Sequence, residues 1–151
     1  MIKMTLKLIS AALLCCAFVY SAQAVEEYSN PAVGGYDTVA YFTQSKAVKG
    51  SGVHSHTHDG QVYLFSSKEN KAKFIKKPNK YAPQFGGYCA FGAAKGKKFH
   101  SDPTVFAVVK KKLYLNLNKD IQAQWNEGRS KMIKQGHKNW KKIRTASASS
   151  L

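Results

Sequence analysis

The clearest alternation of hydrophobic and polar residues surrounds Asp59-Gly60. Residues 53–58 and 61–65 alternate on either side of this dipeptide, which is favoured in the two-residue type I′ turns of β-hairpins. A turn of this length also sets the expected pairing of the strands: His58 opposite Gln61, His56 opposite Tyr63, and His54 opposite Phe65.

Helical periodicity follows this hairpin and returns near the C-terminus. Ser66 and Glu69 form a capping box for a helix that ends at Pro78. Residues 119–127 are expected to form a second helix. A third helix carries lysines on one side and an apolar stripe on the other, formed by Met132, Ile133, Gly136, Trp140 and Ile143.

The remaining segments predict short strands and an irregular middle. Residues 39–42, 105–109 and 113–117 have the apolar character of strands, and the glycine-rich and aromatic residues 81–98 indicate an ordered loop. No repeat or long linker is expected within residues 28–143. Because strands and helices are segregated along the chain, the pattern predicts an α+β fold. We expect a small antiparallel sheet with a central hairpin, one mid-chain helix and C-terminal helices.

The N-terminal segment is typical of a signal peptide. A basic start at Lys3 and Lys7 precedes a short apolar run, and Ala22-Gln23-Ala24 offers the small residues of a cleavage site. The run is too short to span a bilayer, and the residues before Cys15 and Cys16 disfavour lipidation. We therefore expect a signal peptide over residues 1–24, a domain over 25–144 and a disordered tail over 145–151. The mature protein is expected in the periplasm or secreted, without a transmembrane segment.

Cleavage after Ala24 would leave Cys89 as the lone cysteine of the mature chain. No internal disulfide can then form. A single thiol in an exported protein indicates burial, metal ligation or pairing with a second chain, and these alternatives stay open.

The chain is strongly basic, with a formal charge of +16 that falls by two when Lys3 and Lys7 are removed. Positive charge accumulates towards the C-terminus, over residues 131–144. Such a surface attracts anions, including lipid headgroups, polysaccharides and nucleic acid. Nucleic acid is disfavoured as a partner because the protein is exported and carries no recognition motif.

Several motifs follow one another in the order and spacing of a known family. They are Gly35-Tyr36-Asp37-Thr38-Val39-Ala40-Tyr41-Phe42, Tyr63-x-Phe65, Pro78-x-x-Tyr81-Ala82-Pro83-Gln84-Phe85-Gly86-Gly87-Tyr88-Cys89-Ala90, Asp102-Pro103 and Leu113-Tyr114-Leu115-Asn116. The chain resembles the exported branch of the YHS-domain family over residues 28–143. This resemblance implies a compact α+β module and an association with metals, copper above all.

The resemblance breaks at the cysteines that look like metal ligands in other members of the family. Ala40, Ser66 and Asn70 occupy those three positions in this chain. The thiolate site that the resemblance implies therefore cannot be transferred to this protein.

Three histidines suggest another metal site. His54, His56 and His58 alternate along one predicted strand, so their imidazoles are expected to face the same side. Imidazoles suit copper, zinc or nickel. We expect the ligands to be His56, His58 and Cys89, with His54 and His100 as substitutes. The alternative is a solvated histidine face without a metal.

Catalysis is disfavoured because the sequence contains no phosphate loop, nucleotide fingerprint or metalloprotease motif. The expected function is therefore an exported, non-catalytic YHS-like protein that binds or passes on copper, or else zinc or nickel, without an organic cofactor. A metal-handling protein is a possible partner. The alternative is a basic module that binds anionic envelope components or a partner protein without metal, and a thiol-dependent enzyme using Cys89 ranks below both.

Overall fold

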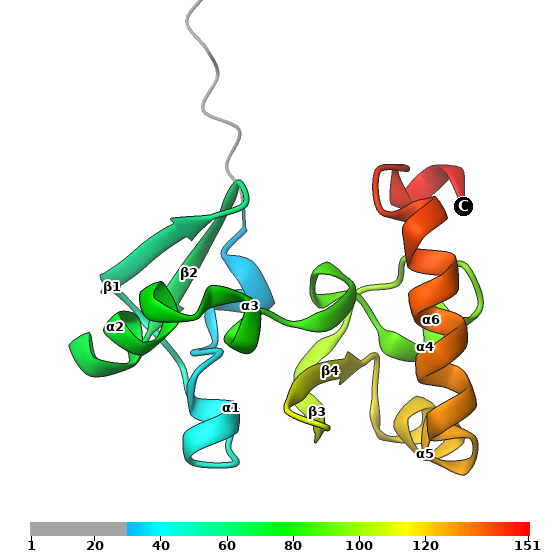
Figure 1. The fold of residues 1–151 in the computed structure, drawn as a ribbon, viewed down its shortest axis with the longest axis horizontal. Coiled ribbons are helices and arrows are strands. Elements are labelled where there is room, and N and C mark those ends of the chain that lie inside the picture. The colour runs from blue at the N-terminus through cyan, green and yellow to red at the C-terminus, as the bar shows by residue number, and fades with distance from the viewer. Residues whose placement is uncertain (1–29) are drawn as a thin grey trace, which may run out of the picture.

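The computed structural model describes residues 30–151, so the expected signal peptide and its cleavage site lie outside the described residues. Two units lie side by side (Figure 1). The first unit comprises η1 (Ala32–Gly35), α1 (Ala40–Thr43), β1 (Ser51–His58), β2 (Gln61–Phe65) and α2 (Lys68–Lys76). After α3 (Pro78–Tyr81), the second unit comprises η2 (Gln84–Gly87), α4 (Ala90–Ala94), β3 (Asp102–Val109), β4 (Lys112–Asn116) and α5 (Lys119–Glu127). The chain ends with α6 (Arg129–Ile143) and η3 (Ala148–Ser150).

The α+β prediction is confirmed, with the strands in two separate antiparallel hairpins, β1-β2 and β3-β4, instead of one sheet. The helix expected at residues 119–127 is present as α5. None of the helices within residues 30–151 combines the length and apolar composition needed to cross a membrane.

The two units are copies of one structural repeat, which the sequence analysis did not detect. Adding 51 to the residue numbers of the first ladder reproduces the second: the pair His56 and Tyr63 becomes Ala107 and Tyr114. Both ladders have an irregularity at the same place, between Ser51 and Ser55 in the first. The expectation that residues 28–143 contain no repeat was therefore wrong.

Local chemistry at the ends of the hairpins is also repeated. Both two-residue turns have positive φ throughout, at Asp59-Gly60 and at Lys110-Lys111, as type I′ turns require. Ser67 caps α2 and Asn118 caps α5, each accepting a hydrogen bond from the backbone amide three residues later. The first residues of the two units, Pro-x-x-Gly-Gly-Tyr at 31–36 and 83–88, form the equivalent turns η1 and η2.

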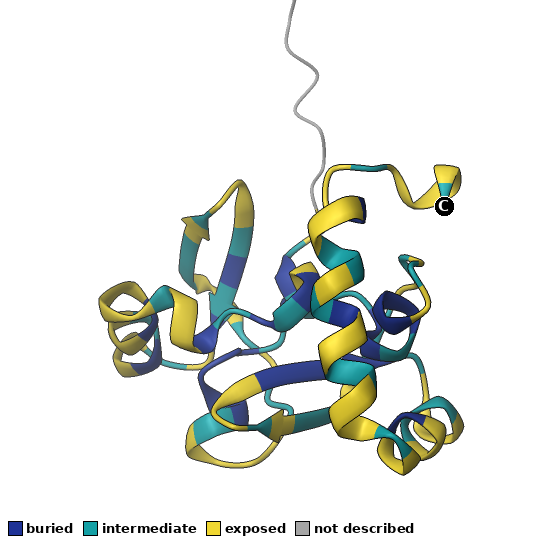
Figure 2. Ribbon diagram, turned by 45° about the vertical axis from the view of Figure 1, so that its right-hand side comes forward, coloured by how far each residue is buried: buried dark blue, intermediate teal, exposed yellow. Residues whose placement is uncertain are grey.

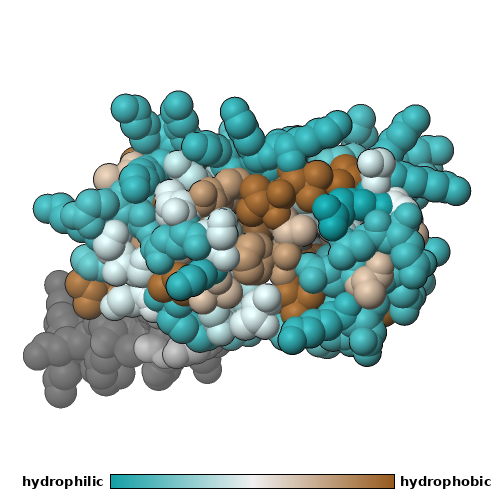
Figure 3. All heavy atoms as spheres, turned by 90° about the horizontal axis from the view of Figure 1, so that it is seen from below, coloured by the Kyte–Doolittle hydropathy of each residue, from teal (hydrophilic) through white to brown (hydrophobic). Residues whose placement is uncertain are grey.

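Each unit has its own hydrophobic core, and a third cluster joins them. Phe74 lies in the core of the first unit and Trp125 in that of the second. Between the units, the Tyr41 hydroxyl donates to the Pro103 carbonyl at 2.8 Å, and the Tyr41 ring packs 4.7 Å from Phe106. Residues of β4 are largely buried (Figure 2). On the face seen from below, hydrophobic residues gather in the middle, with hydrophilic ones around them (Figure 3).

Several local expectations were wrong. Residues 39–42 lie largely in α1 rather than a strand, because Asp37 caps the amides that begin this turn of helix. The N-cap of α2 is Ser67, since the Ser66 hydroxyl bonds to Asp37 instead. The expected loop at 81–98 contains η2 and α4. The tail, expected to be disordered, contains η3. Just before it, the carbonyls of Arg144 and Ala146 accept hydrogen bonds from the Lys98 ammonium group.

The Asp37 carboxylate connects the segments of the first unit. It is fully buried. One oxygen accepts from the amides of Val39 and Ala40, at 2.9 and 3.3 Å. The other accepts from the amide and hydroxyl of Ser66, at 2.9 and 2.6 Å, and from the Asn70 side-chain amide at 2.7 Å. Five donors thus satisfy a charge that would otherwise be costly to bury.

We expect Asp37→Asn to lower the free energy of unfolding by about 3 kcal/mol, because an amide replaces one acceptor oxygen and places donors against donors. Asp102→Asn is the matched control, since the Asp102 carboxylate accepts only from neighbouring Thr104. Urea denaturation of both variants measures the difference. Equal losses in the two variants would contradict the role given to Asp37.

Candidate functional site

The hairpin histidines are separated by the irregularity in β1. His56 and His58 lie beside Phe74, with ring centroids 6.2 and 5.7 Å from it. The pairing of His56 with Tyr63 and of His58 with Gln61 is confirmed, but Phe65 pairs with Ser51 rather than His54. His54 instead lines a groove between β1 and α2, apart from the edge-on contacts that His56 and His58 make with Phe74.

His58 has an unusual environment. Its Nε2 atom is buried and has no hydrogen-bond partner among residues 30–151. The Asp59 carboxylate lies 3.5 Å from this nitrogen. The buried Nε2 of His58 thus lacks a hydrogen-bond partner but lies near a carboxylate.

The structure does not bring Cys89 and His100 to these histidines. Cys89 lies in the second unit, fully buried, where its thiol faces the Asn116 side-chain oxygen at 3.7 Å. His100 is exposed and lines a cavity between the units, with Ser101 and Gly87. Within residues 30–151, no three His, Cys, Asp or Glu side chains come together in a group placed to hold a metal ion.

The three positions at which the family that the chain resembles carries cysteines do converge in space. The side chains of Ser66 and Asn70 and the amide of Ala40 all bond to Asp37. The two Asp37 oxygens are already occupied by five donors, and none of these side chains is a thiol. The residues present therefore do not fit the metal centre that the resemblance implies, and they form a structural hydrogen-bond network there instead.

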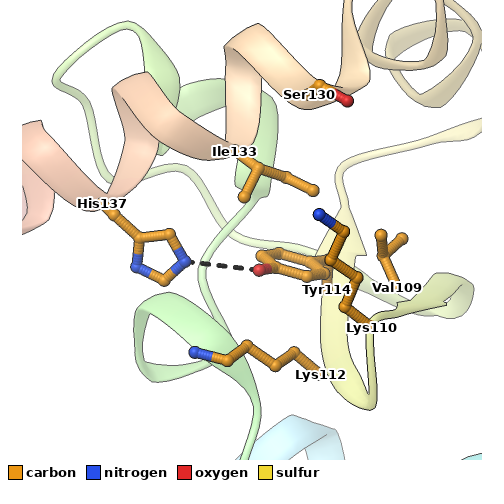
Figure 4. A pocket seen from close by; sticks show the side chains of 7 residues that line it. All are labelled: Val109, Lys110, Lys112, Tyr114, Ser130, Ile133 and His137. Carbon is orange, nitrogen blue, oxygen red and sulfur yellow. Dashed lines mark hydrogen bonds between the residues drawn. The ribbon is translucent and has the colours of Figure 1, made fainter.

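A basic pocket lies in the second unit, between the β3-β4 turn and α6 (Figure 4). Its volume is about 230 Å³. Inside it, the Tyr114 hydroxyl lies 3.3 Å from His137 Nε2. The residues that line this basic pocket are Val109, Lys110, Lys112, Tyr114, Ser130, Ile133 and His137.

Close packing of α6 on the second unit forms one wall of the basic pocket. A Cβ atom at Gly136 would lie only 2.8 Å from the Phe85 ring, so glycine permits the helix to approach. The same ring lies 5.0 Å from His137. One turn further on, the Asn139 side chain donates to the carbonyls of Ala93 and Ala94. These contacts fix the position of His137 opposite β4.

The pocket is cationic at its edge and uncharged inside. Burial lowers the pKa of His137 below its usual value of 6.5, and the nearby charges of Lys112 and Lys141 lower it further. Burial also raises the pKa of Tyr114. At neutral pH the inner groups are therefore a neutral imidazole and a neutral phenol, while Lys110 and Lys112 supply positive charge.

The sequence analysis did not identify this pocket. It named none of Lys110, Lys112 and His137 as a candidate site residue. The available signal was the spacing of Ser130, Ile133 and His137, which places them on one face of a helix. Which hairpin that face contacts could not be read from the spacing.

Comparisons of the chain with protein-family models, curated proteins and solved structures found no match.

We expect His137 to make the protein less stable in mild acid. Below about pH 6.5 the unfolded chain binds a proton at His137 that the folded protein, with its lowered pKa, does not yet bind. The free energy of unfolding therefore falls as pH drops from about 6.5 to the folded pKa, and this residue contributes no slope above that range. Denaturation of wild type and His137→Gln between about pH 7.5 and 5 measures this contribution. Identical slopes would show that His137 titrates alike in both states.

Proposed function

We propose that this protein is an exported, non-catalytic module, similar to YHS domains, that binds anionic components of the cell envelope through its basic second unit. The observation that carries the proposal is the lack of charge pairing. Within residues 30–151 the one ion-pair contact joins His58 and Asp59, so no lysine or arginine there is paired with a carboxylate.

Four lysines, two that line the pocket and two on the adjoining part of α6, make up what we call the basic face. Lys110 and Lys112 come from the hairpin, and Lys134 and Lys141 follow Ser130 and His137 by one helical turn on α6. All four are exposed. Adjacent unpaired cations attract a polyanion and accelerate its association, with a strong dependence on ionic strength.

The non-catalytic part of the proposal is supported by the surroundings of Cys89. The thiol is buried and faces Asn116, an amide that cannot act as a general base. The surroundings of Cys89 therefore do not match an activated nucleophile with its base.

Titration with heparin, a sulfated polysaccharide, tests this proposal. We expect salt-sensitive binding by the mature protein, and we expect replacement of the four basic-face lysines by glutamine to weaken it by at least about tenfold. The charge-matched control replaces four exposed lysines of the first unit, Lys46, Lys73, Lys76 and Lys77. An equal loss in the control would show that net charge alone decides binding. No binding by wild type would refute the proposal.

A metal function is the second candidate, because the buried His58 Nε2 has no hydrogen-bond partner and His56 lies beside the same Phe74 ring. Calorimetry with Cu²⁺ on protein without a histidine tag tests it. We expect His56→Ala/His58→Ala to remove most of the affinity, and we expect wild-type binding to weaken below about pH 6 as imidazoles protonate. His54→Ala/His100→Ala removes the same number of imidazoles as a control. Unchanged affinity in the first double variant would eliminate this hairpin site.

A further inference from the structure

We propose that the basic pocket recognises a single carboxylate attached to a small apolar group. This inference rests on the proposed function and deepens it, because the pocket lies within the basic face and would select one acid group there. The acid would belong either to a free organic molecule or to the end of an envelope polymer. Both sources present the same chemistry to the protein.

The walls and the edge of the pocket differ in character. Val109, Ile133 and the Tyr114 ring supply apolar surface, and the Lys110 and Lys112 ammonium groups lie on opposite sides of the Tyr114 hydroxyl (Figure 4). A ligand whose apolar part contacts the walls can therefore place its carboxylate between two cations. An inorganic anion would leave the apolar surface without a partner.

The size of the pocket limits what can enter it. Its volume of about 230 Å³ is below the range of about 300–1,000 Å³ that is usual for sites of drug-sized ligands. A small acid or the terminal residue of a chain fits this space. A bulkier ligand would have to remain largely outside.

The first unit shows that the fold does not require this pocket chemistry. Lys110 and Lys112 correspond to Asp59 and Gln61 in the first hairpin, whereas a tyrosine, Tyr63 or Tyr114, stands at the same position in both. The shared tyrosine serves the common core. The two lysines are specific to the second unit. The long helix α6 is also specific to it, because the first unit has only the short α3 in the corresponding place.

Neutral His137 positions the Tyr114 hydroxyl and adds no charge to the pocket. Its pKa is lowered by burial and by nearby lysines, so it can accept a hydrogen bond from the Tyr114 hydroxyl at neutral pH. That contact holds the phenol between the two ammonium groups. The anion is thus expected to meet two flexible cations around a fixed aromatic centre.

Benzoate is a suitable probe, with neutral benzamide and inorganic phosphate for comparison. Binding to the mature protein is measured by ligand-observed NMR titration. We expect saturable benzoate binding that is at least about tenfold tighter than that of either comparison compound, because only benzoate combines charge with an apolar ring.

Two double variants with equal loss of charge test the residues. Lys110→Asn/Lys112→Gln alters the pocket, and asparagine tolerates the positive φ at position 110. Lys111→Asn/Lys119→Gln alters exposed lysines that do not line it. We expect about a tenfold loss of benzoate affinity in the first variant and less than about a twofold loss in the second. Thermal unfolding of both variants checks that they remain folded.

The outcomes separate this inference from the proposed function. Loss of benzoate binding in the pocket variant alone supports the site, whether or not heparin binds to the wild type. Heparin binding without benzoate binding overturns the site and leaves the proposed function standing. Equal affinity for benzoate and phosphate, or equal losses in the two variants, also overturns it. Binding of an oligomer that ends in an aromatic carboxylate more tightly than benzoate assigns the acid to a polymer end, and the reverse order assigns it to a free acid.

Discussion

Each unit contains a short helix, α1 or α4, whose first backbone amides need hydrogen-bond acceptors. In both units the acceptor also connects the start of this helix to the end of a hairpin, and the rest of the unit depends on that connection. In the first unit Asp37 accepts from the Val39 amide and also bonds to Ser66, just after β2. In the second unit Asn116, at the end of β4, accepts from the Phe91 amide. The acceptor precedes the helix in the first unit and ends the hairpin in the second, but in both units it connects the helix to the end of a strand.

The different acceptors have consequences for the chemistry of each unit. A carboxylate at Asp37 requires a surrounding set of donors, which occupies the polar side chains of Ser66 and Asn70. The corresponding residue of the second unit is Cys89, whose thiol faces Asn116 in a buried position. Ser66 and Asn70, at two of the cysteine positions of the family that the chain resembles, therefore hold the fold together. Polar groups available for binding lie further out, at the hairpin ends.

Local signals in the sequence predicted the hairpin turn at Asp59-Gly60 and the helix α5, because turn chemistry and helix caps act over a few residues. The motif Pro-x-x-Gly-Gly-Tyr occurs twice, at 31–36 and 83–88, but the repeat was missed because other equivalent positions, such as Phe74 and Trp125, carry different residues. The expected cluster of His56, His58 and Cys89 is not formed because Cys89 is buried within the second unit, where its thiol faces Asn116. Sequence spacing carries no information about which surfaces of two such units meet.

The repeat also provides a comparison within one chain between what the fold needs and what a site needs. Positions that agree, such as Tyr63 with Tyr114 and Ser67 with Asn118, serve the core and the helix caps. At the hairpin ends the units differ in charge: Asp59 lies near the His58 imidazole, whereas Lys110 and Lys112 line the pocket with Tyr114 and His137. One hairpin end thus carries a carboxylate and the other carries two ammonium groups. Because neither charge pattern is needed to form a type I′ hairpin, these two ends are where binding specificity is expected to reside.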